Sequence, residues 1–403
     1  MTTKDSDMFT ALGASSLLAS LPPRQGFGDA TLIRLAPGAI DLGGGNPATG
    51  LLPTELYRDA SAAFFSGDDF PRALRYSPAP GLPALRAAIA EREGVEAERV
   101  LVTNGGAHGL ALVALGTLDR GDVIVVDDPV YPLFLRVLDL VGASVVGVPV
   151  GADGLDVDAL AARLRAGLRP KALFTVPTFH NPSGGTLSAQ KADALVDLAE
   201  KYGFTIIADD PYREIAFPGT VVPRRARLRE SPQVVSVGTF SKTLGPGLRL
   251  GWLVVPPALA EHYVRLRNRL DGQSSAVLQE IVTRILSDAR FGPALRTAGE
   301  GYAEKAGALV EALRTEFGDD VDVDAPQGGF FAWARLRGDL DFAQLFEAAQ
   351  DAGVTYQRGE WFSATGERPF RGHARLSFSE PEVHELREGV SRLAQAWRAL
   401  RAR

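Results

Sequence analysis

Short apolar runs alternate with amphipathic helical patterns from about residue 100 onward. A strand inside a parallel sheet is buried on both faces and therefore appears as a continuous apolar run, whereas a helix repeats its apolar positions every three or four residues. Such runs, rich in β-branched residues, occupy positions 100–103, 123–127, 144–148, 172–176, 205–209, 234–238 and 251–255. Their alternation with helices predicts an α/β fold, with a seven-stranded, mainly parallel sheet covered by helices on both faces.

The helical patterns and later strands predict how the chain divides into domains. In the pattern at 189–202, Ala192, Leu195, Val196 and Ala199 fall at helical spacing with charged residues between them. Further helical patterns lie at 258–270, 274–286 and 302–317, and strands are predicted at 330–336 and 374–378. We therefore predict a large domain over residues 48–290, a small α+β domain over 291–403, and an N-terminal segment, 1–47, that joins the small domain.

Composition removes several functional classes. The net charge of -6 disfavours a nucleic acid or an anionic membrane as partner. No apolar run approaches the roughly 20 residues that span a bilayer, and the first residues lack the basic region of a secretory signal, so we expect a cytoplasmic protein. The absence of cysteine excludes disulfides and thiol nucleophiles, and five scattered histidines predict no metal site.

Lysine is scarce in this chain, with six lysines among 43 basic residues. Lys242 lies between the predicted strands 234–238 and 251–255, a place where an ordinary solvated lysine is not expected. A lysine amine can lose its proton and attack a carbonyl carbon, which an arginine cannot do. Lys242 is therefore the candidate Schiff-base nucleophile, and Arg249, seven residues later, offers a fixed cation for a phosphate.

A glycine pair follows the first predicted strand. Gly105 and Gly106 lead into an apolar helix, where backbone amides and the helix dipole favour an anion such as phosphate. A tight turn that simply requires glycine is the ordinary alternative.

These segments carry a family resemblance. The run SVGTFSKTLGPGLRLGW around Lys242 resembles the lysine signature of the class I/II aminotransferases, which are fold-type I enzymes that depend on pyridoxal 5'-phosphate (PLP). Further matching segments follow in the family's order from about Gly43 to Arg375, which covers nearly the whole chain. The resemblance implies PLP as cofactor, an α-amino acid and a 2-oxo acid as substrates, and a homodimer.

The resemblance also implies roles for individual residues. Lys242 would form the Schiff base with PLP and move the proton, Asp209 would hold the pyridine nitrogen protonated, and Tyr212 would donate to the phenolic oxygen. The phosphate and ring would be bound by Gly105, Gly106, Ala107, Tyr131, Asn181, Thr239, Ser241 and Arg249, with Tyr76 from the partner subunit. The substrate would be bound by Gly45, Asn181 and Arg375, the last gripping the α-carboxylate through two parallel donors.

The chain departs from the family pattern at two places. Relatives usually have Gly-Ser-Gln-Gln where this chain has Gly105, Gly106, Ala107 and His108, so the hydroxyl donor at Gly106 is missing. His180 stands where glutamine is common and is interpreted as a site-lining residue. The substrate's side chain is not predicted; Arg24, Phe27, Tyr356 and Trp361 are candidate pocket walls.

Three other functions remain open at the level of sequence. A PLP-dependent lyase, decarboxylase or oxidative deaminase would use the same residues and differ in which bond breaks. A ligand-sensing regulator would carry a DNA-binding helix-turn-helix, yet only about 40 residues precede the GGGNP segment and none form a basic recognition helix. Dinucleotide binding would require a Gly-x-Gly-x-x-Gly turn after the first strand, which is absent.

Overall fold

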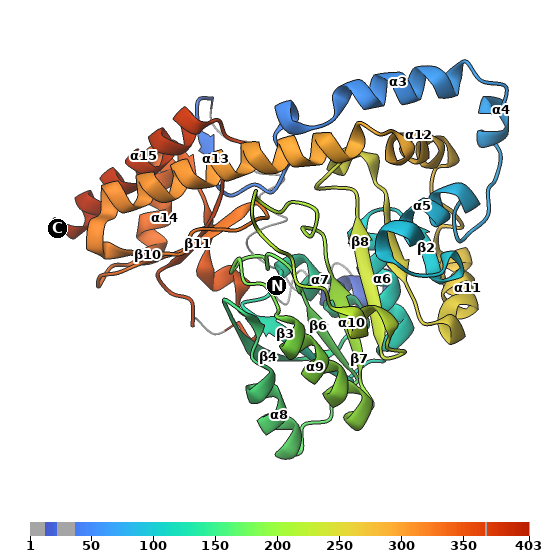
Figure 1. Cartoon of the computed structure of the whole chain (residues 1–403). Helices are drawn as coiled ribbons and strands as arrows, with labels where there is room; N and C mark the ends of the chain where they lie inside the picture. The colour runs from blue at the N-terminus through green and yellow to red at the C-terminus, as the bar shows by residue number, and fades with distance from the viewer. Residues whose placement is uncertain (1–12, 22–36, 367–368, 403) are drawn as a thin grey trace.

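The computed structural model describes residues 13–21, 37–366 and 369–402. Figure 1 shows a large sheet with its helices beside a smaller sheet, and helix α13 (Phe291–Phe317) extends from one to the other. Two short helices, α2 (Ser16–Ser20) and α4 (Phe70–Ala73), lie in the first part of the described chain.

The large sheet has eight strands. Their order is β2 (Val100–Thr103), β9 (Gly251–Val254), β8 (Val234–Thr239), β7 (Thr205–Asp209), β6 (Ala172–Thr175), β3 (Val123–Asp128), β4 (Ser144–Gly151) and β5 (Gly154–Leu155). The five strands from β8 to β4 pair in parallel, whereas β9 runs antiparallel between β2 and β8. The predicted α/β fold and all seven predicted strands are confirmed. The eighth strand, β5, is only two residues long, too short to give a hydrophobic pattern.

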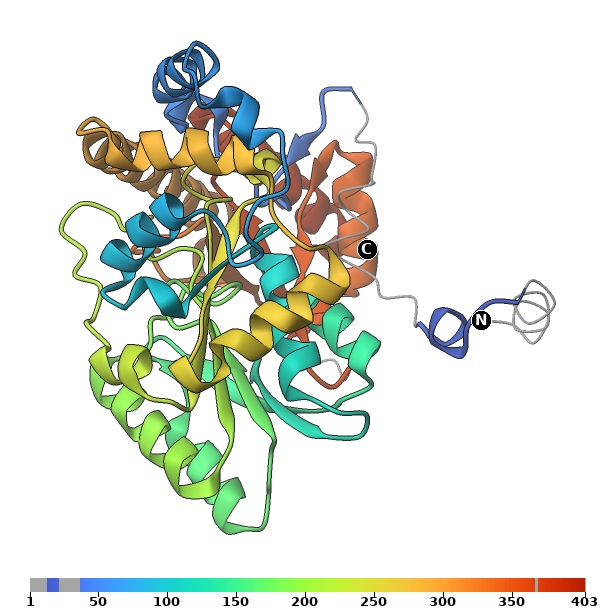
Figure 2. The same ribbon diagram turned by 90° about the vertical axis from the view of Figure 1, so that its right-hand side faces the viewer.

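Helices cover both faces of this sheet, as the turned view in Figure 2 shows. Helices α6 (Gly106–Thr117), α7 (Pro132–Val141) and α11 (Ala260–Leu270) pack on one face. On the other face lie α8 (Val157–Arg165), α9 (Ala189–Tyr202) and α10 (Ala226–Glu230), and toward β2 and β9 lie α3 (Thr54–Phe65), α5 (Pro83–Glu93) and α12 (Ala276–Ser287). Side chains therefore alternate between the two faces along strand β2. Leu101 packs on the first face, whereas Val100 and Val102 pack on the second.

The smaller sheet has the order β10 (Val321–Val323), β11 (Phe331–Leu336), β14 (His373–Ser377) and β13 (Gln357–Arg358). Helices α13, α14 (Phe342–Asp351) and α15 (Val383–Arg401) share its core. Strand β1 (Ile40–Asp41) pairs in parallel with β12 (Val354–Thr355), so the early chain lies beside the late chain. The domain limits at 47/48 and 290/291 stay predictions.

Helix α13 corrects the predicted helix at 302–317. The helix begins at Phe291, and its first part, FGPALRTAGEG, is rich in glycine and has few large apolar residues, so its sequence lacks a clear apolar stripe. The helix therefore continues through a stretch that composition alone disfavours.

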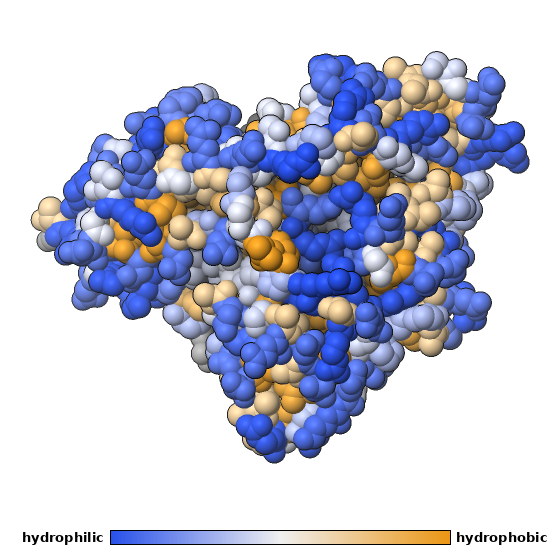
Figure 3. Space-filling view, in the orientation of Figure 1, coloured by the Kyte–Doolittle hydropathy of each residue, from blue (hydrophilic) through white to orange (hydrophobic). Residues whose placement is uncertain are grey.

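No helix in the described ranges is both long and apolar enough to cross a membrane. The face drawn in Figure 3 is mostly hydrophilic, with separate apolar patches.

Candidate active site

The site lies at the carboxyl ends of the parallel strands, the edge at which open α/β sheets bind ligands. Loops that follow β2, β3, β6, β7 and β8 meet there around a cavity of about 730 Å³. Eleven of the predicted site residues line it: Gly45, Gly106, Ala107, Tyr131, Asn181, Asp209, Tyr212, Thr239, Ser241, Lys242 and Arg249. Residues that are up to 204 positions apart in the sequence, from Gly45 to Arg249, thus contribute to one cavity.

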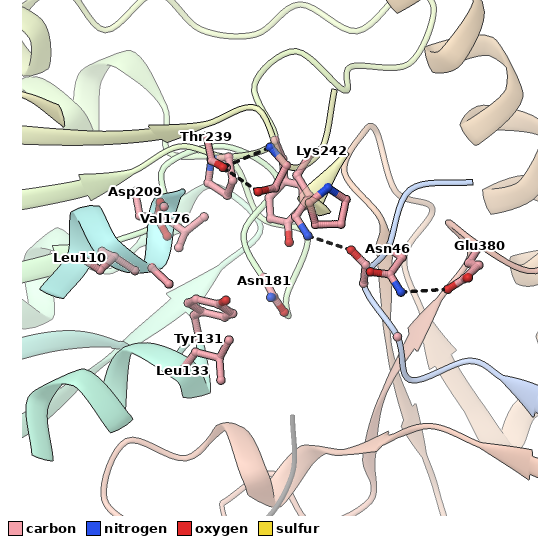
Figure 4. A pocket seen from close by; sticks show the side chains of 18 of the residues that line it. Asn46, Leu110, Tyr131, Leu133, Val176, Asn181, Asp209, Thr239, Lys242 and Glu380 are labelled. Carbon is pink, nitrogen blue, oxygen red and sulfur yellow. Dashed lines mark hydrogen bonds between the residues drawn. The ribbon is translucent and has the colours of Figure 1, made fainter. Parts of the chain in front are cut away.

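Lys242 extends its amine into the cavity (Figure 4). Its Nζ donates to the carbonyl oxygen of Gly45 at 2.8 Å and lies 5.8 Å from the ring centroid of Tyr212. Burial, and then the positive charge of Arg375, lower the pKa of Lys242 to about 8, while Asp209 opposes the shift. A substantial fraction of this amine is therefore neutral in mildly alkaline solution, as a nucleophile requires.

Asp209 ends β7 and is 5% exposed. Burial, and then the neighbouring charge of Asp210, raise the pKa of Asp209 to about 7, and Lys242 opposes the shift. Asp210 does not line the cavity; its side chain hydrogen-bonds Thr178 and is attracted by Arg213 and other cations. Of the two neighbouring carboxylates, Asp209 is therefore the one available to a group bound in the cavity.

Arg375 lies behind the cavity wall. Its side chain is fully buried on β14, and it donates to Asn181 Oδ1 at 3.0 Å and to the carbonyl oxygen of Gly43 at 2.5 Å. Its guanidinium carbon lies 3.9 Å from the ring centroid of Phe331. Burial lowers the pKa of Arg375 to about 10, so the side chain still carries its charge at neutral pH.

The opposite end of the cavity gathers groups suited to a phosphate. Thr239 Oγ1 and Ser241 Oγ lie 2.8 Å apart, and Arg249 has a left-handed backbone with φ of 51°. Gly105 does not line the cavity, but a Cβ on it would lie 3.1 Å from Arg249 Nη2, and Gly106 begins α6. Two hydroxyls, a guanidinium and the amino end of a helix thus converge on one place.

Besides Gly105 and Arg375, two further predicted positions lie outside the cavity. Tyr76 is 99% exposed on the surface of the protomer. The interpretation of His180 as site-lining is wrong, because its ring is buried with Nε2 at 3.2 Å from Asp127 Oδ2, and the same oxygen accepts from the Val176 backbone at 2.8 Å. This carboxylate on one side and Ser183, whose Oγ lies 2.9 Å from Nδ1 on the other, hold the histidine beside Asn181.

The candidate pocket walls also differ from expectation. Tyr356 is buried in the core of the smaller sheet, and Trp361 packs 5.2 Å from the Phe346 ring; neither lines the cavity. Arg24 and Phe27 lie outside the described residues.

Sequence reasoning missed several cavity residues. Asn46 Nδ2 donates to Glu380 Oε2 at 3.3 Å, and Figure 4 shows this pair across the cavity from Tyr131 and Leu133. Asp41 also lines the cavity and accepts from the backbone of Gly43 at 2.7 Å. The turn at Asp41 could have been recognised from the DLGG sequence, but no local signal brings Glu380 to Asn46, 334 residues away.

Among the described residues, no group of three or more histidine, aspartate or glutamate side chains could hold a metal ion.

Residues 37–393 match the family model described as aminotransferase class I and II. The chain is 34% identical to a 2-aminoadipate transaminase of Thermus thermophilus, over 91% of this chain and 92% of that one. It is 30% identical to aromatic-amino-acid aminotransferase 1 of Thermococcus litoralis, over 88% and 87%. The crystal structure of LysN, an alpha-aminoadipate aminotransferase of Thermus thermophilus complexed with N-(5'-phosphopyridoxyl)-L-leucine, is similar at 31% identity and a TM-score of 0.88, covering 98% of this chain and 99% of that one.

Proposed function

The chain belongs to the class I and II aminotransferases, and from this premise we propose how its own residues carry out the reaction. It is a PLP-dependent aminotransferase, which transfers an amino group between an α-amino acid and a 2-oxo acid. When bound, PLP acts as an electron sink that lets a proton leave the substrate's Cα, and it carries the amino group between the two substrates.

The cavity's chemistry fits PLP. The pKa of the buried Asp209 carboxyl is raised to about 7, so a positively charged N–H donor beside it would favour the ionised form. Asp209 would therefore be a carboxylate when it contacts the protonated pyridine nitrogen. Thr239, Ser241, Arg249 and the backbone at Gly106 would hold the phosphate, and Tyr131 would stack on the ring. Asn181 and Tyr212, whose side chains hydrogen-bond each other, would contact the phenolic oxygen.

Lys242 has two tasks in this proposal. Its amine would hold the cofactor covalently between turnovers, and its lowered pKa of about 8 supports that role. Once a substrate has displaced it, the neutral amine would take the proton from Cα as general base and would then, as general acid, deliver it to the cofactor rather than back to Cα, so that the amino group can leave the substrate. Gly45, whose carbonyl accepts from Lys242 Nζ at 2.8 Å, steers the amine.

We propose that Arg375 and Asn181 hold the substrate's α-carboxylate. Arg375 is already oriented by Asn181 Oδ1 and Gly43 O, and its buried charge is compensated best by an anion. Gly45 contributes its backbone close by. Fixing the carboxylate determines which bond to Cα faces the ring.

We also propose that Glu380 disfavours acidic substrate side chains. Among the described lining residues the cations, Lys242 and Arg249, have tasks assigned above, whereas the Glu380 carboxylate accepts a hydrogen bond from the neutral Asn46 amide. A neutral side chain is therefore favoured over a second carboxylate. This preference would separate the protein from the relative named for 2-aminoadipate.

A homodimer completes the site in this proposal. Tyr76 would reach the phosphate bound by the partner subunit. Phe65, Leu74 and Tyr76 are 51%, 67% and 99% exposed, an unusual concentration of large apolar side chains for a free surface.

The single observation that carries the proposal is the placement of Lys242, Asp209 and Arg249 around one cavity. The test is to mix PLP-loaded protein with an amino acid and a 2-oxo acid and follow the new amino acid together with ammonia and CO2. The proposal is supported if one new amino acid forms for each amino acid consumed and neither ammonia nor CO2 is released. Release of ammonia or CO2 as the main product would instead favour the deaminase, decarboxylase or lyase alternative.

A further inference from the structure

His108 stands in the first turn of α6, beside the proposed phosphate site, but it does not line the cavity. Its Nδ1 accepts a hydrogen bond from the Asn104 backbone N–H at 3.0 Å. The ring thereby ties the helix to the turn that leads out of β2. A histidine accepts through a ring nitrogen only when that nitrogen carries no proton.

Asn104 also contacts groups of the proposed phosphate site. Arg249 Nη2 donates to the Asn104 carbonyl oxygen at 3.3 Å, and the Asn104 side-chain amide donates to Asp271 Oδ2. Asn104 is therefore bonded by the ring through its N–H and by the guanidinium through its C=O. Any shift of this residue moves Arg249 relative to the amino end of α6.

Charged groups from three segments face the His108 ring. Asp271 Oδ2, which follows α11, lies 3.7 Å from Nε2. Asp271 is held in turn by the fully buried Arg267, whose Nε donates at 3.1 Å. Arg249 and Arg267 add positive charge, and burial is the largest of the effects that lower the pKa of His108 below its usual 6.5. The ring is therefore neutral at pH 7, with its proton on Nε2 toward Asp271.

We propose that His108 is a positioning residue for the cofactor's phosphate, and that its protonation weakens PLP binding by breaking the bond to Asn104. This inference rests on the proposed function. Protonated Nδ1 would present an N–H to the Asn104 N–H, so the turn would rearrange and Arg249 would lose its orientation. The expected direction of the change in PLP affinity distinguishes this mechanism from a purely electrostatic one, because an added positive charge that acted only through its electric field would tighten the binding of a phosphate.

The experiment measures the dissociation constant of PLP for the cofactor-free protein between pH 5.5 and 8. His108→Asn places an amide oxygen at the position of Nδ1 and cannot be protonated, so it should bind PLP like the parent protein at pH 8. His108→Ala should bind about tenfold more weakly than His108→Asn at every pH, because one ordering hydrogen bond is gone. His108→Gln, whose amide reaches toward Asp271 instead, should resemble His108→Ala.

The ratio of the parent's constant to that of His108→Asn isolates the histidine, because Lys242 and the phosphate titrate in both proteins. This ratio should rise as the pH falls from 7 to 5.5, by about two- to fivefold, because the lowered pKa of His108 delays its protonation. A ratio that stays flat or falls, or His108→Ala binding like the parent at pH 8, would overturn the inference. If the parent protein bound no PLP at any pH, the proposed function itself would fail instead.

Discussion

At the scale of single residues, Asp209 links the site to stability. Its pKa is raised from 3.8 to about 7 in the folded protein. Between these values the folded state keeps a proton that the unfolded state has lost, so the free energy of unfolding of the cofactor-free protein falls as the pH rises from 4 to 7.

We therefore predict that Asp209→Asn is more stable than the parent at pH 8 without cofactor, by on the order of 3 kcal/mol. At pH 3 the difference should nearly vanish, because Asp209 is then mostly protonated in both states. Urea unfolding of both cofactor-free proteins at the two pH values checks this. Equal stability at pH 8 would show that Asp209 bears no burial cost.

Glu380 provides a second residue-scale prediction. Glu380→Gln removes a negative charge but keeps the shape and the Asn46 contact, so kcat/KM for amino acids with an acidic side chain should rise about tenfold. Values for neutral amino acids should change by less than about twofold. A uniform change across both substrate classes would contradict a specificity role; Glu347→Gln, on an exposed carboxylate of α14 that does not line the cavity, is the control.

Single residues were predictable where a side chain stands out from its surroundings. Lys242 does so, because lysine is rare here and this one falls between two buried runs. His180 misled because its position beside Asn181 in the sequence says nothing about the direction of its ring, which the Asp127 carboxylate decides. Glu380 gave no signal, since its place in the cavity depends on a contact with Asn46 across most of the chain.

At the scale of elements, the turn into α6 depends on close backbone contacts. A Cβ on Gly251 at the start of β9 would lie 2.7 Å from the Gly238 carbonyl oxygen and 2.9 Å from the Gly105 carbonyl carbon. Because both of these neighbours are backbone atoms, rotating a side chain cannot relieve the contact, and the backbone itself must shift.

We predict that Gly251→Ala lowers the free energy of unfolding by about 2 kcal/mol and weakens PLP binding, since the phosphate turn must shift. Gly247→Ala is the control, because a Cβ there meets nothing within 4 Å. Urea unfolding and PLP titration of both variants test this. Gly251→Ala with unchanged PLP affinity would separate the turn from phosphate binding.

Elements were predictable where burial is complete. The central strands are apolar over most of their length, and their positions followed from that pattern within a few residues. The short strand β5 and the glycine-rich start of α13 were not, because pairing to β4 and packing against neighbouring segments determine them rather than local pattern.

At the scale of the whole molecule, the proposed dimer predicts complementation between subunits. Each site would use Lys242 from one subunit and Tyr76 from its partner. A heterodimer of Lys242→Ala with Tyr76→Ala therefore contains one site with both residues intact. We predict that mixing equal amounts of the two variants under subunit exchange raises activity above that of either alone, toward a quarter of the parent's, because half of the dimers are then heterodimers with one intact site of two. Activity equal to the average of the two separate variants would contradict a shared site.

The arrangement of the two sheets was only partly predictable. Alternating strands and helices indicated the large sheet, but the pairing of β1 with β12 joins residues over 300 positions apart, and no local pattern specifies such a partner. The same large separation in sequence explains why the sequence alone did not place Asp41 and Glu380 in the site.

The central claim is that the amine of Lys242 holds PLP, and one measurement tests it most directly. Borohydride reduction makes a lysine–cofactor bond permanent, and peptide mass spectrometry then locates it among the six lysines of the chain. The account predicts a phosphopyridoxyl group on Lys242 alone, absent from Lys242→Ala. A label on another lysine, such as Lys305, or no label on PLP-loaded protein would contradict it.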